Sequence, residues 1–253
     1  MRGRLLEDPI KEVAAMQLIG GKNPHVLGPI EVLQDDEYLF TVMPYCSGGD
    51  LFGVVVKYAE ESGGEIGMPE PVARFWFRQI LLGLQHLQSV GVCHRDLSLE
   101  NVLVSSENCL IIDMGMCLRV PYRTIRRLIK PQGVCGKHNY MSPEIFANTN
   151  AFDGFSIDLW AAGVILYIML TGFPPYDQAS QTDQRFDLIV NGNLIRQLES
   201  WDIRLSQNGG DLLQSMLQVD PRDRLTLAEI MAHPWVNTGE VVQPPPPEPL
   251  PYY

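Results

Sequence analysis

The segment CHRDLSLENVLV, from Cys93 to Val104, gathers a histidine, an arginine, an aspartate, a glutamate and an asparagine between His94 and Asn101. An apolar run precedes it and Val-Leu-Val follows it, so these residues form a charged loop between two core elements. Carboxylates, imidazoles and amides are the groups with which proteins accept protons and hold hard cations. We therefore expect the loop to carry out chemistry. The uncharged Ser98 in its middle raises the question of whether this residue impairs that chemistry.

Two more motifs follow in order: DMG at 113–115 and SPE at 142–144. Together with HRDLSLEN at 94–101, they resemble the catalytic loop, the D-F-G motif and the A-P-E motif of eukaryotic protein kinases. The resemblance spans about Pro9 to Val236 and is greatest to serine/threonine kinases of the calcium/calmodulin-dependent group. It implies an α+β, protein-kinase-like fold, in which a mostly helical lobe adjoins a remnant small lobe of one helix and two strands.

The resemblance gives three polar residues a role in phosphoryl transfer from ATP to a protein serine or threonine. Asp96 would accept the proton of the substrate hydroxyl and orient it. Asn101 and Asp113 would supply oxygen ligands to Mg²⁺, which bridges the ATP phosphates. Each residue alone would be typical of a turn on a surface loop, whereas all three at these spacings favour the enzyme.

The resemblance also locates the nucleotide. Residues 40–52, FTVMPYCSGGDLF, match the hinge between the lobes. The positions that face the adenine, beginning at the gatekeeper, are Met43, Pro44, Tyr45 and Cys46. Leu103 would pack beneath the base.

Asp50 and Glu100 stand where related kinases receive arginines on the N-terminal side of the acceptor residue. We therefore predict a basophilic substrate preference, in keeping with the acidic balance of the chain. The alternative is that Asp50 binds only ribose and Glu100 only caps the loop.

Several further matches are structural. Glu144 and Arg224 would form the buried ion pair that ties the activation segment to the helical lobe. Asp158 would hold the backbone of the catalytic loop, and Glu12 takes the paired position on the first helix.

The catalytic loop departs from the family at one cation. The family carries a lysine two residues after the aspartate, where this chain has Ser98, and a threonine where it has Lys137. Because the two positions lie against each other in the family fold, we predict that Lys137 reaches the γ-phosphate while Ser98 takes the hydroxyl contact. The alternative is that Lys137 is an exposed surface residue.

The activation segment departs as well. Gly133 replaces the threonine that many relatives phosphorylate, so Arg95 lacks its usual phosphate partner. Thr124, within a basic run, is the only threonine of the segment, and we expect no conventional threonine switch. Met114 should fill the apolar slot beside His94, because methionine adapts to irregular gaps.

A Gly-rich loop and a strand with a V-A-I-K lysine precede the first helix in the family, and this chain starts at that helix. Lys11 and Lys22 lie in the wrong places to substitute. We therefore expect a chain that is N-terminally truncated relative to the family, that leaves the edge of its small sheet open, and that phosphorylates feebly or not at all.

Hydrophobic periodicity and turn residues predict helices at 8–19, 69–90, 156–171, 183–190, 210–218 and 225–232. Short strands are expected at 26–34, 37–43, 102–104 and 109–113. Residues 116–143 show little periodicity, which indicates a functional segment. These patterns divide the chain into a partial small lobe (1–44), a large lobe (45–237) and a Pro-rich extended tail (238–253).

Composition narrows the function further. A net charge of −11 argues against a nucleic-acid binder, which needs a basic face. Five cysteines at irregular spacings favour reduced thiols in a cytoplasmic protein, without excluding access to the nucleus. The N-terminus has no signal-like apolar run, and the apolar stretch 159–170 is too short to span a bilayer, so we expect no membrane association.

Two functions stay open at this point. The chain is either a serine/threonine kinase domain or a non-catalytic relative that acts as a binding module, and the presence of Asp96, Asn101 and Asp113 favours the enzyme. The P-x-x-P pattern at 244–247 could dock a polyproline-reading domain, with a solvated spacer as the alternative.

Overall fold

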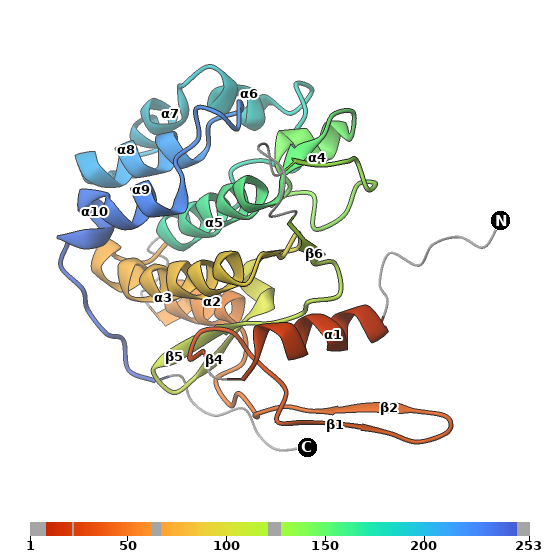
Figure 1. Cartoon of the computed structure of the whole chain (residues 1–253). Coiled ribbons are helices and arrows are strands. Elements are labelled where there is room, and N and C mark those ends of the chain that lie inside the picture. Colours follow the sequence, from red (N-terminus) through yellow and green to blue (C-terminus); the bar gives the residue numbers. More distant parts are fainter. Residues whose placement is uncertain (1–8, 22, 62–66, 121–127, 247–253) are drawn as a thin grey trace.

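The small lobe consists of one helix and a long hairpin at one end of the molecule (Figure 1). The computed structural model describes residues 9–21, 23–61, 67–120 and 128–246. Helix α1 (Pro9–Ile19) is followed by the antiparallel strands β1 (Glu31–Gln34) and β2 (Leu39–Val42). The Asp35 carboxylate accepts hydrogen bonds from the backbone N–H groups of Glu37 and Tyr38 and so closes the hairpin turn.

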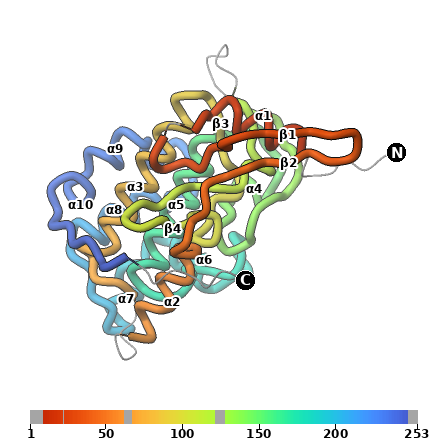
Figure 2. The backbone as a smooth tube through the Cα atoms, turned by 90° about the horizontal axis from the view of Figure 1, so that it is seen from below, coloured from red at the N-terminus to blue at the C-terminus, as the bar shows by residue number. Residues whose placement is uncertain are grey.

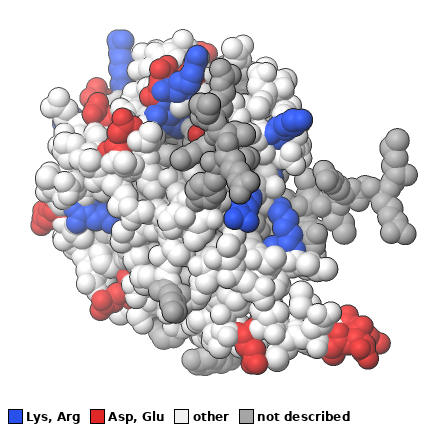
Figure 3. Space-filling model, in the orientation of Figure 1, with Lys and Arg blue, Asp and Glu red and all other residues white. Residues whose placement is uncertain are grey.

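The hairpin has solvent on both faces. Seen from below in Figure 2, it extends past the large lobe, and large apolar side chains such as those of Leu33 and Phe40 are exposed on it. Figure 3 shows an acidic cluster at its tip, where Asp35, Asp36 and Glu37 lie. Both strands were predicted, and each is shorter in the structure than the predicted range because pairing is confined to the segment beside the turn.

The large lobe begins with two helices, α2 and α3, which precede the loop at residues 94–98 in the chain. Helix α2 (Leu51–Glu61) starts at Asp50, whose carboxylate accepts a hydrogen bond from Gly53 N at 2.7 Å. Helix α3 (Glu70–Ser89) follows, with prolines at its start and a continuous buried face that includes Trp76, Ile80, Leu84 and Leu87. The 3.6-residue spacing predicts α3 correctly, whereas no pattern predicts α2.

Two short antiparallel pairs hold the catalytic loop between them. Strand β3 (Val92–Cys93) pairs with β6 (Leu118–Arg119), and β4 (Val102–Ser105) pairs with β5 (Asn108–Ile111). The 3₁₀ turn η1 (Leu99–Asn101) leads directly into β4. Residues 94–98 therefore form a short loop that is fixed by a strand at one end and by a turn and strand at the other.

Helix α5 (Gly154–Thr171) is the core of the large lobe (Figure 1). The Asp153 carboxylate caps its start by accepting from Phe155 N and Ser156 N, and Gly172, with a φ of 80°, ends it. Its length and composition would suit a membrane span, with a mean hydropathy of 1.6, but 89% of that window is buried inside the protein. This burial is typical of a core helix packed on all sides.

Smaller elements complete the large lobe. They are α4 (Pro143–Ala147), β7 (Leu128–Ile129) paired with β8 (Phe152–Asp153), α6 (Gln184–Val190), α7 (Leu194–Ser200), α8 (Gln207–Met216), α9 (Leu227–Ala232) and α10 (Pro234–Asn237). Helix α8 begins three residues before its predicted start because the Ser206 side chain caps it by accepting from Gly209 N. Helix α7, like α2, was not predicted.

The segment after α10 passes the N-terminal end of α3 (Figure 1). Arg74 of α3 donates to the carbonyl oxygens of Trp235 and Glu240, and Val242 N donates to Pro71 O at 3.1 Å. Residues 241–246 form no regular element, as the Pro-rich composition predicts, and the rest of the predicted tail, 247–253, lies outside the described residues.

Gly83 allows α3 to approach the β4–β5 strand pair closely. A Cβ at Gly83 would lie 2.7 Å from His25 O and 2.8 Å from Ile111 Cδ1, so we expect Gly83→Ala to lower the free energy of unfolding by about 1–3 kcal/mol. At Gly53 a Cβ would meet only Asp50 Oδ1 at 3.5 Å, and Gly53→Ala should stabilise α2 by about 0.5–1 kcal/mol. Urea denaturation of both variants measures the difference, and equal effects would show that α3 does not pack this closely.

Candidate active site

The catalytic loop is supported from below by one buried carboxylate. Asp158 of α5 accepts hydrogen bonds from His94 N at 2.7 Å and from Arg95 N at 2.9 Å. Burial raises the pKa of Asp158 to about 6, and the two N–H donors favour its ionised form at neutral pH. Arg95 has a φ of 72°, a strained value for a residue with a side chain, and these two hydrogen bonds help to hold it there.

His94 ties the same loop to the end of β5. It is fully buried, and its Nε2 lies 2.7 Å from Ile112 O. Its Nδ1 accepts a hydrogen bond from Asp96 N at 3.2 Å. The imidazole therefore connects the backbone at Asp96 to the strand that leads to Asp113.

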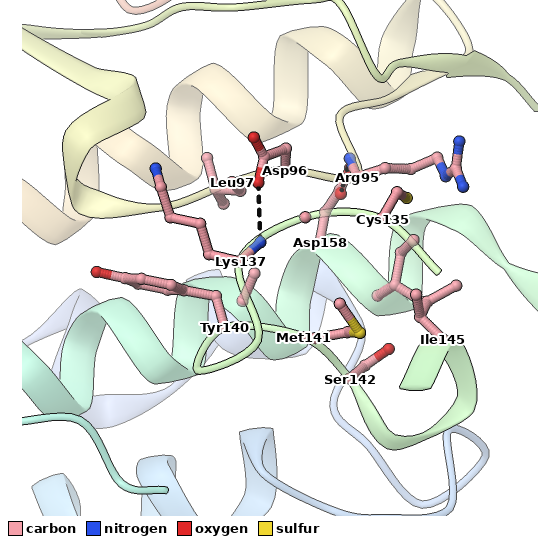
Figure 4. A pocket seen from close by; sticks show the side chains of 13 residues that line it. Arg95, Asp96, Leu97, Cys135, Lys137, Tyr140, Met141, Ser142, Ile145 and Asp158 are labelled. Carbon is pink, nitrogen blue, oxygen red and sulfur yellow. Dashed lines mark hydrogen bonds between the residues drawn. The ribbon is translucent and has the colours of Figure 1, made fainter. Parts of the chain in front are cut away.

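Asp96 lines a small pocket of about 20 Å³ (Figure 4), and the Asn101 side chain is hydrogen-bonded to it. Asn101 Nδ2 donates to Asp96 O at 2.7 Å and reaches Asp96 Oδ2 at 3.3 Å. Asp96 Oδ1 accepts from Lys137 N at 3.2 Å. The carboxylate is half-buried and fixed in direction, which is what a general base requires.

Strand pairing brings Asp113 to the same end of the site as Asn101. Ile112 N donates to Asn101 O at 3.0 Å, next to the Val102–Ile111 pair of the β4–β5 ladder. Asp113 is exposed, with a φ of 65°, and its Oδ1 accepts from Gly115 N at 3.1 Å.

The donor set at this end suits Mg²⁺. Within the described part of the chain, no hydrogen bond reaches Asn101 Oδ1 or Asp113 Oδ2, so both oxygens are available to a cation. Mg²⁺ is commonly held by one or two protein oxygens together with phosphates and water. An amide and a carboxylate therefore fit it without further protein ligands.

Lys137 and Ser98 meet across the pocket. Lys137 Nζ donates to the buried Ser98 Oγ at 2.7 Å and lies 3.6 Å from Glu100 Oε1. Tyr140 O–H also donates to Glu100, at 3.3 Å, and burial raises the pKa of this tyrosine, so it stays protonated. The contact between positions 98 and 137 is as predicted. The sequence did not predict the contact between Tyr140 and Glu100, although Tyr140 follows Lys137 by three residues.

The hinge residues form a shelf beside β4. Gly48 N donates to Val104 O at 3.0 Å and Val104 N donates to Gly49 O at 2.8 Å, which brings Leu103 next to Asp50. Met43, Pro44 and Tyr45 are exposed, and Cys46 is buried with a raised thiol pKa. Among the described residues, the shelf leaves three of the four predicted adenine positions, 43–45, open to solvent, whereas Cys46 is buried.

Arg224 and Glu144, predicted as a buried ion pair, form a bidentate salt bridge. Arg224 Nη1 donates to Glu144 Oε1 at 2.9 Å and Nη2 donates to Oε2 at 3.2 Å. The Arg224 side chain is fully buried and also donates to Ser156 and to Gln218 O, while its guanidinium lies over the Trp160 ring. Since Glu144 lies in the first turn of α4, the pair ties α4 and the end of the activation segment to the loop between α8 and α9 and to the start of α5.

Arg95 lacks an anionic partner in the described structure. Its Nη1 donates to Met116 O at 3.2 Å, and its buried Nε and Nη2 meet no described acceptor. Gly133 occupies the position at which many related kinases carry a phosphorylated threonine, and its φ is 94°. Thr124 and the basic run around it lie outside the described residues. Met114 is buried in the main core cluster, which also contains Met16.

Helix α1 faces the start of the activation segment. Burial is the main cause of the raised pKa of the Cys117 thiol. The positive charge of Lys11 lowers this pKa and the negative charge of Glu12 raises it. His86 of α3 lies 2.9 Å from Ile19 O and fixes the far end of α1. Glu12 lies in the first turn of α1, and Lys22 is outside the described residues.

The site thus combines a fixed carboxylate, two oxygen ligands and a hinge shelf in a two-lobed α+β fold, which is the arrangement of a phosphoryl-transfer enzyme. A comparison with known families matches the protein kinase domain over residues 4–236. The chain therefore belongs to the eukaryotic protein kinases, of the serine/threonine type.

Named relatives agree with this assignment. Calcium-dependent protein kinase 21 of Arabidopsis thaliana is 32% identical over 94% of this chain and 42% of its own length. Serine/threonine-protein kinase DCLK3 of Homo sapiens is 32% identical over 86% of this chain and 32% of its own. CBL-interacting protein kinase 31 of Oryza sativa subsp. japonica is 30% identical, with shares of 93% and 49%. The chain spans about a third to a half of these proteins.

The Glu144–Arg224 pair can be tested by denaturation. Glu144→Ala leaves a fully buried guanidinium without its counter-charge, so the free energy of unfolding should fall by about 3–5 kcal/mol. Glu144→Ala combined with Arg224→Met should cost less than Glu144→Ala alone, because the unpaired charge is gone. Arg204→Ala, which removes a fully solvated pair with Asp202, should change stability by less than about 1 kcal/mol. A loss at Glu144 no larger than that at Arg204 would contradict a structural role for the pair.

Proposed function

We propose that the chain is the catalytic part of a kinase that transfers the γ-phosphoryl group of ATP to serine or threonine hydroxyls of proteins. The observation that carries the proposal is the fixed Asp96 carboxylate, which Asn101 and Lys137 N hold at the pocket rim. The serine/threonine type of the family supports this substrate class.

In this mechanism the substrate hydroxyl donates its hydrogen bond to the Asp96 carboxylate, which aims the oxygen and takes its proton. The new bond from that oxygen to the γ-phosphorus forms as the bond between the γ-phosphorus and the β–γ bridging oxygen breaks, and ADP leaves with the bridging oxygen. Asn101 Oδ1 and Asp113 would hold Mg²⁺, which, when bound, neutralises phosphate charge. The adenine would lie on the hinge shelf at residues 43–46 and above Leu103, with the ribose near Asp50. Asp158 and His94 keep the loop in place while charge shifts within it.

We also propose that residues 1–253 by themselves transfer phosphate feebly. The described small lobe offers a helix and an exposed hairpin, and residues 1–253 contain no Gly-rich loop and no V-A-I-K motif. Both features normally position the phosphates.

A non-catalytic binding module is the second candidate. The exposed hinge shelf and the Pro-rich segment support it, since the latter would suit a polyproline-reading domain. The kinase is favoured because a scaffold has no use for Asp96, Asn101 and Asp113 in this geometry. The reduced, mostly buried thiols also support a cytoplasmic protein.

Loss of the general base tests the enzyme directly. With Mg-ATP at millimolar concentration, the chain should transfer labelled phosphate slowly to a serine/threonine peptide library, and Asp96→Asn should lower that rate by about 10²–10⁴-fold. Asp187→Asn, an exposed change on α6, serves as the control and should keep the wild-type rate. Joining a Gly-rich loop and lysine strand from a related kinase ahead of α1 should raise the wild-type rate. Transfer that survives Asp96→Asn, or none with the added strands, would favour the binding module.

The predicted substrate preference has its own test. If Asp50 and Glu100 receive basic residues, a peptide library should show enrichment of arginine on the N-terminal side of the phosphorylated residue. Glu100→Gln should reduce the enrichment at one position by about 2–5-fold, as expected for a partly solvated ion pair. Glu107→Gln, in the exposed β4–β5 turn, is the matched control. A flat profile, or one unchanged by Glu100→Gln, would leave Glu100 as a loop residue only.

A further inference from the structure

The proposed reaction brings a highly charged phosphate to a site that is itself acidic. Asp96, Glu100 and Asp113 lie on the catalytic loop or beside it, and catalysis of phosphoryl transfer depends on cations aimed at the transferred group. Among the described residues that line the pocket, only Arg95 and Lys137 carry a permanent positive charge. The source of the protein's cation is therefore one of these two.

Arg95 is directed away from the reacting position. Its guanidinium donates to Met116 O and lies 5.9 Å from the Phe152 ring centre. In Figure 4 its side chain extends toward Cys135, on the side of the pocket opposite to the Asp96 carboxylate. To contact the phosphate, the Arg95 guanidinium would therefore have to give up its contacts with Met116 O and with the Phe152 ring.

Lys137 is delivered to the reacting position by a close backbone contact. Gly136, with a φ of 88°, allows this approach, because a Cβ there would lie 2.9 Å from Arg95 O and 3.2 Å from Asp96 Oδ1. Lys137 N then donates to Asp96 Oδ1. The backbone of Lys137 is fixed at the catalytic carboxylate, while its side chain, 37% exposed, can reorient. Figure 4 shows the Lys137 ammonium and the Asp96 carboxylate on the same side of the pocket.

The ammonium rests on groups that a phosphate can replace. Ser98 Oγ accepts one hydrogen bond at 2.7 Å, and the half-exposed Glu100 carboxylate lies at 3.6 Å. Exchange of Glu100 for a phosphate oxygen replaces one anionic partner of the ammonium by another, so the lysine charge stays paired, and the half-exposed Glu100 carboxylate is left to solvent or to a basic group of the substrate. Lysine suits this exchange because its charge is compact and its stem is flexible.

From these contacts we propose that Lys137 is a catalytic residue whose ammonium contacts the γ-phosphate, with Ser98 as the hydroxyl that positions it. This inference rests on the proposed function and deepens it. It also implies that nucleotide binding releases Glu100 from Lys137, so that Glu100 becomes free to receive a basic residue of the substrate.

The experiment uses the full chain and two readouts, the rate of phosphate transfer at saturating Mg-ATP and the ratio of Mg-ATP to Mg-ADP affinity from ³¹P NMR titration. Lys137→Ala should lower the transfer rate by about 10²–10³-fold, as removal of one transition-state donor does, and bring the affinity ratio close to one. Lys137→Thr combined with Ser98→Lys moves the cation across the same contact and should restore both readouts, which also controls for folding. Lys57→Ala, on the exposed face of α2, should leave both unchanged.

The outcomes separate this inference from the proposed function. If wild type transfers phosphate in an Asp96-dependent way and Lys137→Ala keeps its rate and affinity ratio, Lys137 is a surface residue and the inference is overturned. Failure of the double exchange to recover either readout, with an intact thermal unfolding transition, would overturn it as well. Absence of both transfer and nucleotide binding in wild type, even with the added strands, would instead reject the kinase function on which the inference rests.

Discussion

The geometry of the active site depends on a single carboxylate under the catalytic loop. Asp158 accepts hydrogen bonds from both His94 N and Arg95 N, and it does so from the N-terminal part of the buried helix α5. An ionised carboxylate at such a depth is unfavourable, as its raised pKa shows, and the hydrogen bonds offset part of that cost. In return the loop is fixed to a rigid element, and with it the positive φ of Arg95 and the direction of Asp96.

A second constraint comes from the activation segment, which both positions and neutralises the loop. Gly136 lets the segment touch the backbone at Arg95, and Lys137 then contributes an N–H to Asp96 and an ammonium to Ser98 and Glu100. The Glu144–Arg224 pair holds the other end of the segment on the core. The charge that the loop lacks in its own sequence is thus supplied by a segment whose two ends are fixed.

The sequence predicts well whatever depends on local pattern or motif. The amphipathic repeat of α3, the apolar α5 and the hairpin at Asp35 follow from residues close in the chain. Helix α2 escapes prediction because its valine run and Gly53 disfavour a helix locally, and burial of Leu51 and Val55 together with the Asp50 cap decides otherwise. The Ser98–Lys137 contact joins positions 39 residues apart, so only alignment of both to one family could predict it. Tyr140 on Glu100 had no comparable motif to reveal it.

The distribution of contacts separates chemistry from nucleotide binding in this chain. Every group proposed to act on the transferred phosphate lies in the large lobe, where hydrogen bonds to nearby backbone and side-chain groups fix it. Most of the groups proposed to hold the nucleotide base, residues 43–45, are exposed on the hinge shelf, next to a hairpin that is solvated on both faces. Because transition-state stabilisation and ground-state binding contribute separately to the rate, the proposed catalytic groups would keep their geometry even if this chain bound ATP weakly. Strands that pair with the open hairpin edge would then act chiefly on nucleotide affinity, and the proposed γ-phosphate contact of Lys137 would be independent of them.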